Sequence, residues 1–155
     1  MAAEGIPDFE KRLRFVLCMH NKTRCLVEPN PGTPAGHFIN ENTVVRLAAM
    51  MEAAGMKAPH GETPDNVAWP ETCVRTLFLL RNIIVHEAEG YYWEEELKLT
   101  QSRRHLPAFR KFARAHGAAE VSEGEKLGLD AQEVITPLVD GCVEYARERG
   151  KLRVR

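Results

Sequence analysis

The stretch that most restricts how this chain can fold is the apolar run TCVRTLFLLRNIIV, which covers residues 72–85 and follows Pro70. At about 100° per residue, its apolar side chains cover nearly the whole circumference of a helix. Such a helix lies at the centre of a domain or is shared with a second subunit. Because proline suits the first helical position, the sequence predicts a central helix from Pro70 to about Gly90.

Other segments repeat apolar residues at helical spacing. We expect a first helix over 8–27 and a second that begins after Asn40 and ends at Gly55. Later in the chain we expect one or two short helices divided near Pro107, and a last helix from Asp130 onward. The Pro- and Gly-rich segments 28–37 and 57–70 indicate loops, and 118–130 indicates an irregular or briefly extended segment. The sequence therefore predicts an all-α up-down bundle of four to five helices. We expect a single domain over 1–155, with a core of about 8–150 and a basic tail over 147–155.

Composition narrows the classes of function. A net charge of −1 over 155 residues does not favour whole-protein attraction to nucleic acid, so RNA binding would need a local basic patch. The four cysteines contain no C-x-x-C pair and indicate reduced core residues. Cys18, His20 and Cys25 match no common zinc spacing, so we expect no metal and no cofactor. Without a signal core or an apolar run of membrane length, we expect a soluble cytoplasmic protein with no membrane partner.

Polar residues interrupt the central apolar helix in a regular way. On a helical wheel, Arg75, Asn82 and His86 share one edge, and Asn82 and His86 are four residues apart, so they can touch. Arg81 falls inside the apolar stripe, where one subunit offers it no evident partner in the sequence. Two copies of this helix about a two-fold axis would bring both sets into one cleft. We therefore expect a homodimer whose interface includes this helix.

These residue types suit RNA cleavage without a metal, in which a 2′-hydroxyl attacks its own neighbouring phosphate. Histidine transfers protons near neutral pH, and the arginine fork fits phosphate oxygens. His86 would therefore act as general acid or base, Arg81 would stabilise the phosphate, and Asn82 would orient them.

The segment RNIIVH, residues 81–86, resembles the R-N-x-x-x-H signature of HEPN domains, which are all-helical proteins. The apolar lead-in CVRTLFLLRN, the EAEGYY segment after it and GEKLGL before a terminal amphipathic helix extend the resemblance. It implies a HEPN-like fold, a homodimer with facing motif helices, and metal-independent endoribonuclease activity with Arg81, Asn82 and His86 as catalytic residues. It also implies the toxin of a toxin–antitoxin or phage-defence system, with a cognate antitoxin as a candidate partner.

A basic segment, SRRHLPAFRKFARAHG, follows the motif helix and contains no acidic residue. Such a segment can steer an RNA backbone toward a cleft. The expected RNA-binding residues are Arg75, Arg103, Arg104, Arg110, Lys111 and Arg114. The alternative is a solvated helix face that places Phe109 and Phe112 in the core and pairs with the acidic YYWEEELK segment before it.

Two other classes of function fit the same residues. The chain could be a non-catalytic HEPN module that binds a nucleotide or a protein partner. It could also be a structural dimerisation domain in which Arg81 and His86 make only intersubunit hydrogen bonds.

Overall fold

The computed structural model of this protein describes residues 5–27, 34–85, 91–93, 103–116, 118–120 and 127–153. Within these residues helices dominate, which confirms the prediction of a helical bundle. The described helices are α1 (Ile6–Val27), α2 (Pro34–Ala53), α3 (Trp69–Val85), the 3-10 helix η1 (Arg103–His105), α5 (Leu106–Ala115) and α6 (Ala131–Arg153). None of the helices in this described part is long and apolar enough to cross a membrane.

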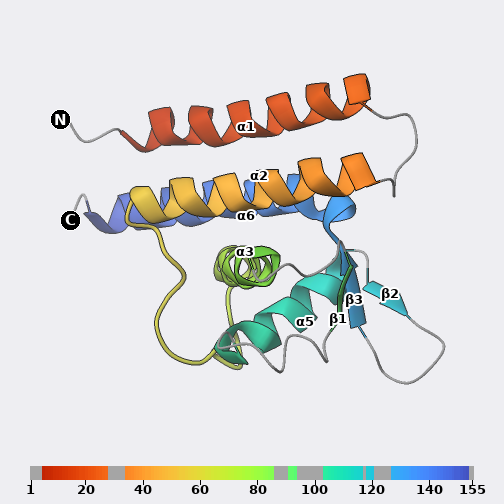
Figure 1. Cartoon of the computed structure of the whole chain (residues 1–155). Coiled ribbons are helices and arrows are strands. Elements are labelled where there is room, and N and C mark those ends of the chain that lie inside the picture. The colour runs from red at the N-terminus through yellow and green to blue at the C-terminus, as the bar shows by residue number, and fades with distance from the viewer. Residues whose placement is uncertain are drawn as a thin grey trace.

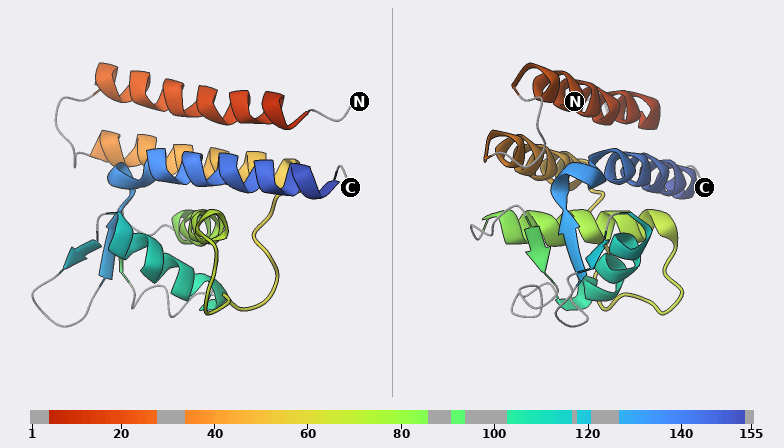
Figure 2. Two further views of the ribbon diagram at one scale, coloured as in Figure 1. Left: turned by 180° about the vertical axis from the view of Figure 1, so that it is seen from behind. Right: turned by 90° about the vertical axis from the view of Figure 1, so that its right-hand side faces the viewer.

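The helices form layers around α3. In Figure 1, α1 lies above α2 and α6, and the axes of these three helices are nearly parallel. Figure 2 shows α2 and α6 side by side beneath α1, with α3 crossing under both. The up-down arrangement predicted from the sequence therefore holds for α1, α2 and α6 only, because α3 lies across them and α5 packs below α3.

The central position of α3 follows from its composition. Every residue from Thr72 to Leu80 is buried, as a helix that is apolar nearly all round requires. Close packing of α3 against α6 depends on Gly141, where an added Cβ would overlap the Cβ and Sγ of Cys73. The glycine thus lets the two helices approach closely at the core.

The second helix begins earlier than the sequence predicts. It starts at Pro34 instead of after Asn40, so part of the predicted loop over 28–37 is helical. Its end is built as expected for a glycine cap: Gly55 has φ 73°, its N–H bonds the Glu52 carbonyl, and the Met56 N–H bonds the Met51 carbonyl at 2.8 Å. Proline tolerates the first helical turn, which explains why the loop-like composition did not prevent a helix.

A small antiparallel sheet accompanies the helices. Its strands are β1 (Tyr91–Trp93), β2 (Ala118–Glu120) and β3 (Leu127–Asp130), in the order β1-β3-β2. Tyr91 pairs with Asp130, and Ala118 pairs with Leu129. The extended segment predicted before the last helix corresponds to β3, whereas the helix expected to include residues 91–93 is wrong there, because pairing with β3 holds them as a strand.

Candidate functional site

Arg81 and Asn82 lie near the C-terminal end of α3. The Arg81 guanidinium donates from Nε to Asn82 Oδ1 at 3.0 Å and from Nη1 to Glu52 Oε2 on α2 at 3.1 Å. Its central carbon lies 5.1 Å from the centre of the Phe78 ring. The Arg81 side chain is 26% exposed. Arg81 therefore has partners within one subunit, which corrects the reading that the chain offers it none.

Glu52 is the electrostatic counterpart of Arg81. The hydrogen bond from Arg81 is the main cause that lowers the pKa of Glu52, and Lys57 also lowers this pKa. The Lys57 Nζ lies 3.6 Å from Glu52 Oε1. An ionised Glu52 fixes the guanidinium through a charge-assisted hydrogen bond. Sequence reasoning missed this partner because Glu52 is 29 positions away along the chain.

The third residue of the motif, His86, lies outside the described residues, as do positions 87–90. Of the expected catalytic set, the structure therefore places Arg81 and Asn82 and brings them into direct contact. The expected contact between Asn82 and His86 remains a prediction from their four-residue spacing.

Arg75, expected to bind RNA, is a core residue that is 1% exposed. Its guanidinium donates to Glu71 Oε2 at 3.0 Å, to the Gly61 carbonyl at 3.1 Å and to the Glu62 carbonyl at 3.4 Å. A side chain buried to this degree does not reach an RNA backbone. The expectation that Arg75 binds RNA is therefore wrong. Its hydrogen bonds instead hold the loop before α3 against that helix.

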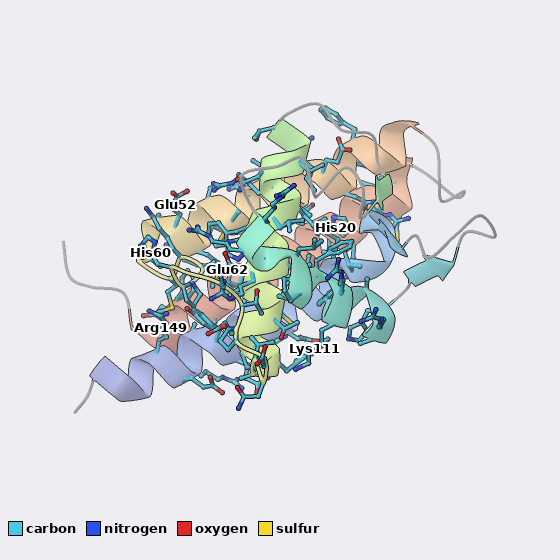
Figure 3. The ribbon with its side chains drawn as sticks, turned by 90° about the horizontal axis from the view of Figure 1, so that it is seen from below. His20, Glu52, His60, Glu62, Lys111 and Arg149 are labelled. Carbon is cyan, nitrogen blue, oxygen red and sulfur yellow. The ribbon has the colours of Figure 1, made fainter. Side chains whose placement is uncertain are left out.

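The two arginines of α3 point in different directions. Six positions along a helix correspond to a rotation of about 240°, so Arg75 and Arg81 leave α3 on different faces. Arg81 reaches Glu52 on α2, whereas Arg75 meets the loop carbonyls and His105 of η1. Figure 3 shows Glu52 on one side of the α3 ribbon and Lys111 on the other.

His105 lies between two guanidinium groups in the core and is 1% exposed. Arg75 Nη1 lies 3.1 Å from its Nδ1, and Arg104 Nε lies 3.2 Å from its Nε2. Burial, helped by the charges of Arg75 and Arg104, lowers the pKa of His105 to about 3. A neutral imidazole has one acceptor nitrogen, so only one of the two arginines can donate to it.

The remaining expected RNA-binding residues lie on η1 and α5, and several take part in internal contacts. Lys111 Nζ donates to the Val67 carbonyl at 2.6 Å, and the Arg104 carbonyl accepts from the Thr63 N–H at 3.1 Å. Phe109 and Phe112 are fully buried. The segment thus packs through its phenylalanines, as the alternative interpretation predicted.

The acidic stretch 94–98 lies outside the described residues, so pairing of the basic segment with it stays a prediction. The exposed members of the basic set are Arg103, Lys111 and Arg114.

The cysteines divide into two pairs. Cys73 and Cys142 are buried and Cys18 and Cys25 are exposed, so the prediction that all four lie in the core is wrong for the second pair. Burial raises the pKa of the Cys73 thiol to about 12 and raises that of Cys142 further. Both therefore stay protonated. No group of three or more His, Cys, Asp or Glu in the described residues could hold a metal ion.

The basic tail is partly helical. α6 continues to Arg153, and Arg147 donates to Glu10 from Nε at 3.0 Å and from Nη2 at 2.5 Å. Arg149 donates to the Tyr145 hydroxyl and lies over its ring, 4.7 Å from the centre. Arg147 therefore links α6 to α1, whereas Arg149 makes its contact within α6.

Sequence reasoning also missed an exposed apolar surface on α1 and α2. Phe15, Met19 and Phe38 are 64%, 44% and 68% exposed. The pattern held a signal for the first two, because Phe15 and Met19 fall beside the buried α1 stripe of Phe9, Leu13 and Val16.

Comparison with known proteins adds no relative: no family model, no curated protein and no solved structure matches this chain. The assignment of a function therefore depends on the residues and geometry described above.

Proposed function

We propose that this protein is a metal-independent endoribonuclease of HEPN type. The observation that carries the proposal is the contact between Arg81 and Asn82 at the partly exposed end of α3, where the guanidinium is held by Nε and Nη1. Within the described residues, Arg81 Nη2 makes no hydrogen bond. This edge of the guanidinium can donate to a phosphate oxygen while its other nitrogens stay fixed.

The proposed reaction is an internal transesterification of RNA. The 2′-hydroxyl attacks the adjacent phosphorus, its proton passes to a base, and the 5′-oxygen of the next nucleotide leaves with a proton. The products are a 2′,3′-cyclic phosphate and a 5′-hydroxyl end. His86 supplies the proton transfer, a role that rests on the sequence motif, and Arg81 stabilises the charge on the phosphorane.

The proposal includes a homodimer with two copies of α3 facing a shared cleft, and a place in a toxin–antitoxin or phage-defence system. RNA and a cognate antitoxin are the proposed partners. The basic residues of η1 and α5 would extend the RNA path, at Arg103, Arg104, Arg110, Lys111 and Arg114.

Cleavage of a labelled RNA in EDTA tests the proposal, with matched variants that separate chemistry from folding. His86→Ala should lower the cleavage rate about 10²-fold or more, and Arg81→Lys about 10²-fold. Glu52→Gln is the control, because it removes the charge of the ion pair but keeps the arginine and a side-chain oxygen that can accept from Arg81 Nη1, and it should retain cleavage. Equal cleavage by wild type and both motif variants, or no cleavage by the wild type, would refute the proposal.

A second candidate is a non-catalytic module that binds a nucleotide or a protein. The observation that favours it is the ion pair of Arg81 with Glu52, which already occupies one nitrogen of the guanidinium. Saturable binding of RNA or nucleotide, lost in Arg81→Ala and without any turnover, would support this candidate.

A further inference from the structure

Helix α1 and its neighbour α2 enclose a groove that the proposed ribonuclease site does not use. One half, of about 380 Å³, is lined on α1 and α2 by Phe15, Val16, Met19, His20, Thr23, Phe38, Ile39, Asn42, Thr43 and Arg46. The other half, of about 320 Å³, is lined by Phe9, Arg12, Arg46, Ala49, Met50, Ala53 and Ala54. Because Arg46 lines both halves, they lie end to end along the helix pair with Arg46 between them, and together they are named the α1–α2 groove.

The groove has the length of a short helix. Its lining on α1 runs from Phe9 to Thr23 and on α2 from Phe38 to Ala53. At a rise of 1.5 Å per residue, these spans are about 21 Å long. An α-helix of about four turns fits such a length when it lies between two antiparallel helices.

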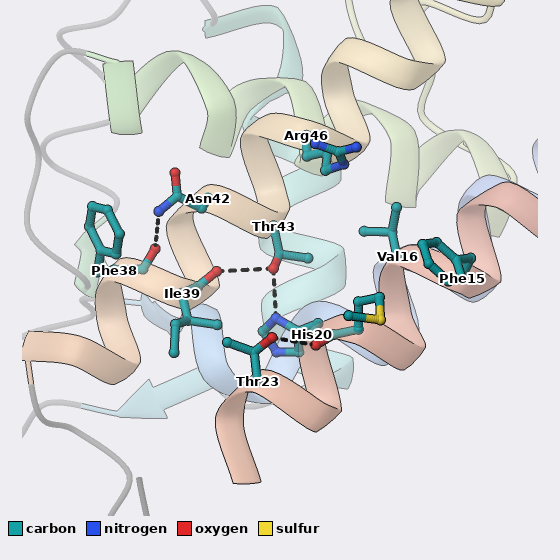
Figure 4. A pocket seen from close by; sticks show the side chains of 10 residues that line it. Phe15, Val16, His20, Thr23, Phe38, Ile39, Asn42, Thr43 and Arg46 are labelled. Atoms are coloured by element: carbon teal, nitrogen blue, oxygen red, sulfur yellow. Dashed lines mark hydrogen bonds between the residues drawn. The ribbon is translucent and has the colours of Figure 1, made fainter. Parts of the chain in front are cut away.

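The rim of the groove carries apolar side chains that stay exposed among the described residues. Phe15 and Phe38 are 64% and 68% exposed. Figure 4 shows these two rings at opposite sides of one half of the groove, with Thr43 between them. Exposed aromatic residues grouped beside a groove are typical of a protein interface.

The floor of this half is uncharged. The Thr43 hydroxyl donates to the Ile39 carbonyl at 3.0 Å, so it accepts from Nδ1 of His20 at 2.6 Å. Burial, with a smaller effect of Arg24, lowers the pKa of His20 to about 4. A neutral imidazole therefore lies beneath the apolar rim, and this floor suits an apolar face of a partner.

The charges on the lining have one sign. The charged residues among the lining side chains are Arg12 and Arg46. Within the described residues, Arg46 makes no hydrogen bond or ion pair. None of the acidic residues of these two helices lines either half; they are Asp8, Glu10, Glu41 and Glu52. An occupant therefore needs an apolar stripe interrupted near its middle by an acidic side chain.

We propose that the α1–α2 groove binds an amphipathic helix of a partner protein that places an aspartate or glutamate against Arg46. A second copy of this chain fits less well, because two facing grooves would bring the Arg46 side chains of both copies toward each other. The proposal is independent of the ribonuclease reaction.

Selection from a phage-displayed library tests this proposal directly. The library consists of amphipathic helices of about 16 residues with a fixed leucine stripe and random residues at the other positions, and the full-length protein is the bait. We expect enrichment of Asp or Glu at the centre of the stripe. On Arg46→Glu protein, the selected residue at that position should change to Lys or Arg.

Matched variants locate the binding. Phe38→Asp should weaken the affinity of an enriched peptide about tenfold or more, measured by fluorescence anisotropy. Val85→Asp is the control, because Val85 is 56% exposed at the end of α3 and lies outside the groove. No enrichment, a central residue indifferent to Arg46→Glu, or equal affinity of the Phe38 variant would overturn the proposal. So would a dimer in light scattering that Phe38→Asp dissociates, since a second copy would then occupy the groove.

Discussion

Replacement of Arg75 by methionine separates a structural role from an RNA-binding role, because the two predict different losses. The structure gives the guanidinium four neighbours: the Glu71 carboxylate, two carbonyls of the loop at Gly61 and Glu62, and the ring of His105. Methionine keeps the apolar stem in place, so the change removes mainly these polar contacts.

The expected loss of stability follows from the exposure of each neighbour. The Glu71 side chain is 25% exposed, and Gly61 and Glu62 are exposed, so water can replace part of their hydrogen bonding. His105 is 1% exposed and lies between Arg75 and Arg104, which face its two different ring nitrogens, so water does not take the place of the lost guanidinium there. We therefore expect Arg75→Met to cost about 3 kcal/mol, at the lower end of the range for breaking a buried ion pair.

Urea unfolding followed by far-UV circular dichroism measures this loss. With a slope of about 2 kcal/mol per molar urea, the midpoint should fall by about 1.5 M. Arg114→Met is the matched control, because Arg114 is exposed on α5, and its effect should stay within about 0.5 kcal/mol. If Arg75→Met is as stable as the wild type and binds RNA less well, the structural assignment of Arg75 is refuted.

Two further predictions concern packing and pH. Gly141→Ala should destabilise the protein by about 1–3 kcal/mol, because the new Cβ overlaps Cys73, and Cys73→Gly in the same chain should recover part of the loss. Without that overlap, helix propensity alone would make Gly141→Ala the more stable form. Stability should also fall as pH drops below about 6.5, because the unfolded histidines take up protons while folded His20 and His105, with pKa values of about 4 and about 3, do not. Each contributes up to about 1.4 kcal/mol per pH unit, and His20→Gln should reduce the slope measured by urea unfolding; an unchanged slope would contradict the role given to His20.

The helices that the sequence predicted well are those with local signals. α1 begins near Pro7 and Asp8, and α3 begins beside Pro70, each followed by a strong apolar pattern. The start of α2 was misplaced because the segment PAGHFIN has the composition of a loop. Gly36 and Asn40 of these first turns are buried, so the start of α2 is set in a tertiary environment that local propensity does not contain.

Long-range partners set the limit of what could be predicted. The strand at residues 91–93 pairs with residues 128–130. Its three aromatic residues favour a strand, but a run of three is too short to reveal which segment it pairs with. Likewise, the partners of Arg75 include His105, which is 30 positions away. The wheel placed Arg81 in the apolar stripe and Arg75 on a polar edge, whereas Arg75 is the buried one of the two and Arg81 is partly exposed. A wheel could not distinguish an arginine whose partners lie in a loop from one that reaches the surface.

The difference between Arg75 and Arg81 narrows where catalysis can occur. If α3 carries a reaction centre, it lies at the C-terminal end of the helix, because the guanidinium of Arg75 is used inside the core. At that end, Arg81 is oriented by Asn82 and Glu52 and keeps one edge without a hydrogen bond in the described residues. A phosphate that binds this edge approaches the ionised carboxylate of Glu52, whose side chain is 40% exposed. Repulsion between the two negative charges therefore opposes binding. Glu52→Gln should therefore raise the affinity for RNA, while Arg81→Lys should lower it. Opposite changes in affinity for these two variants would show that the guanidinium contacts the substrate and does not serve the fold alone.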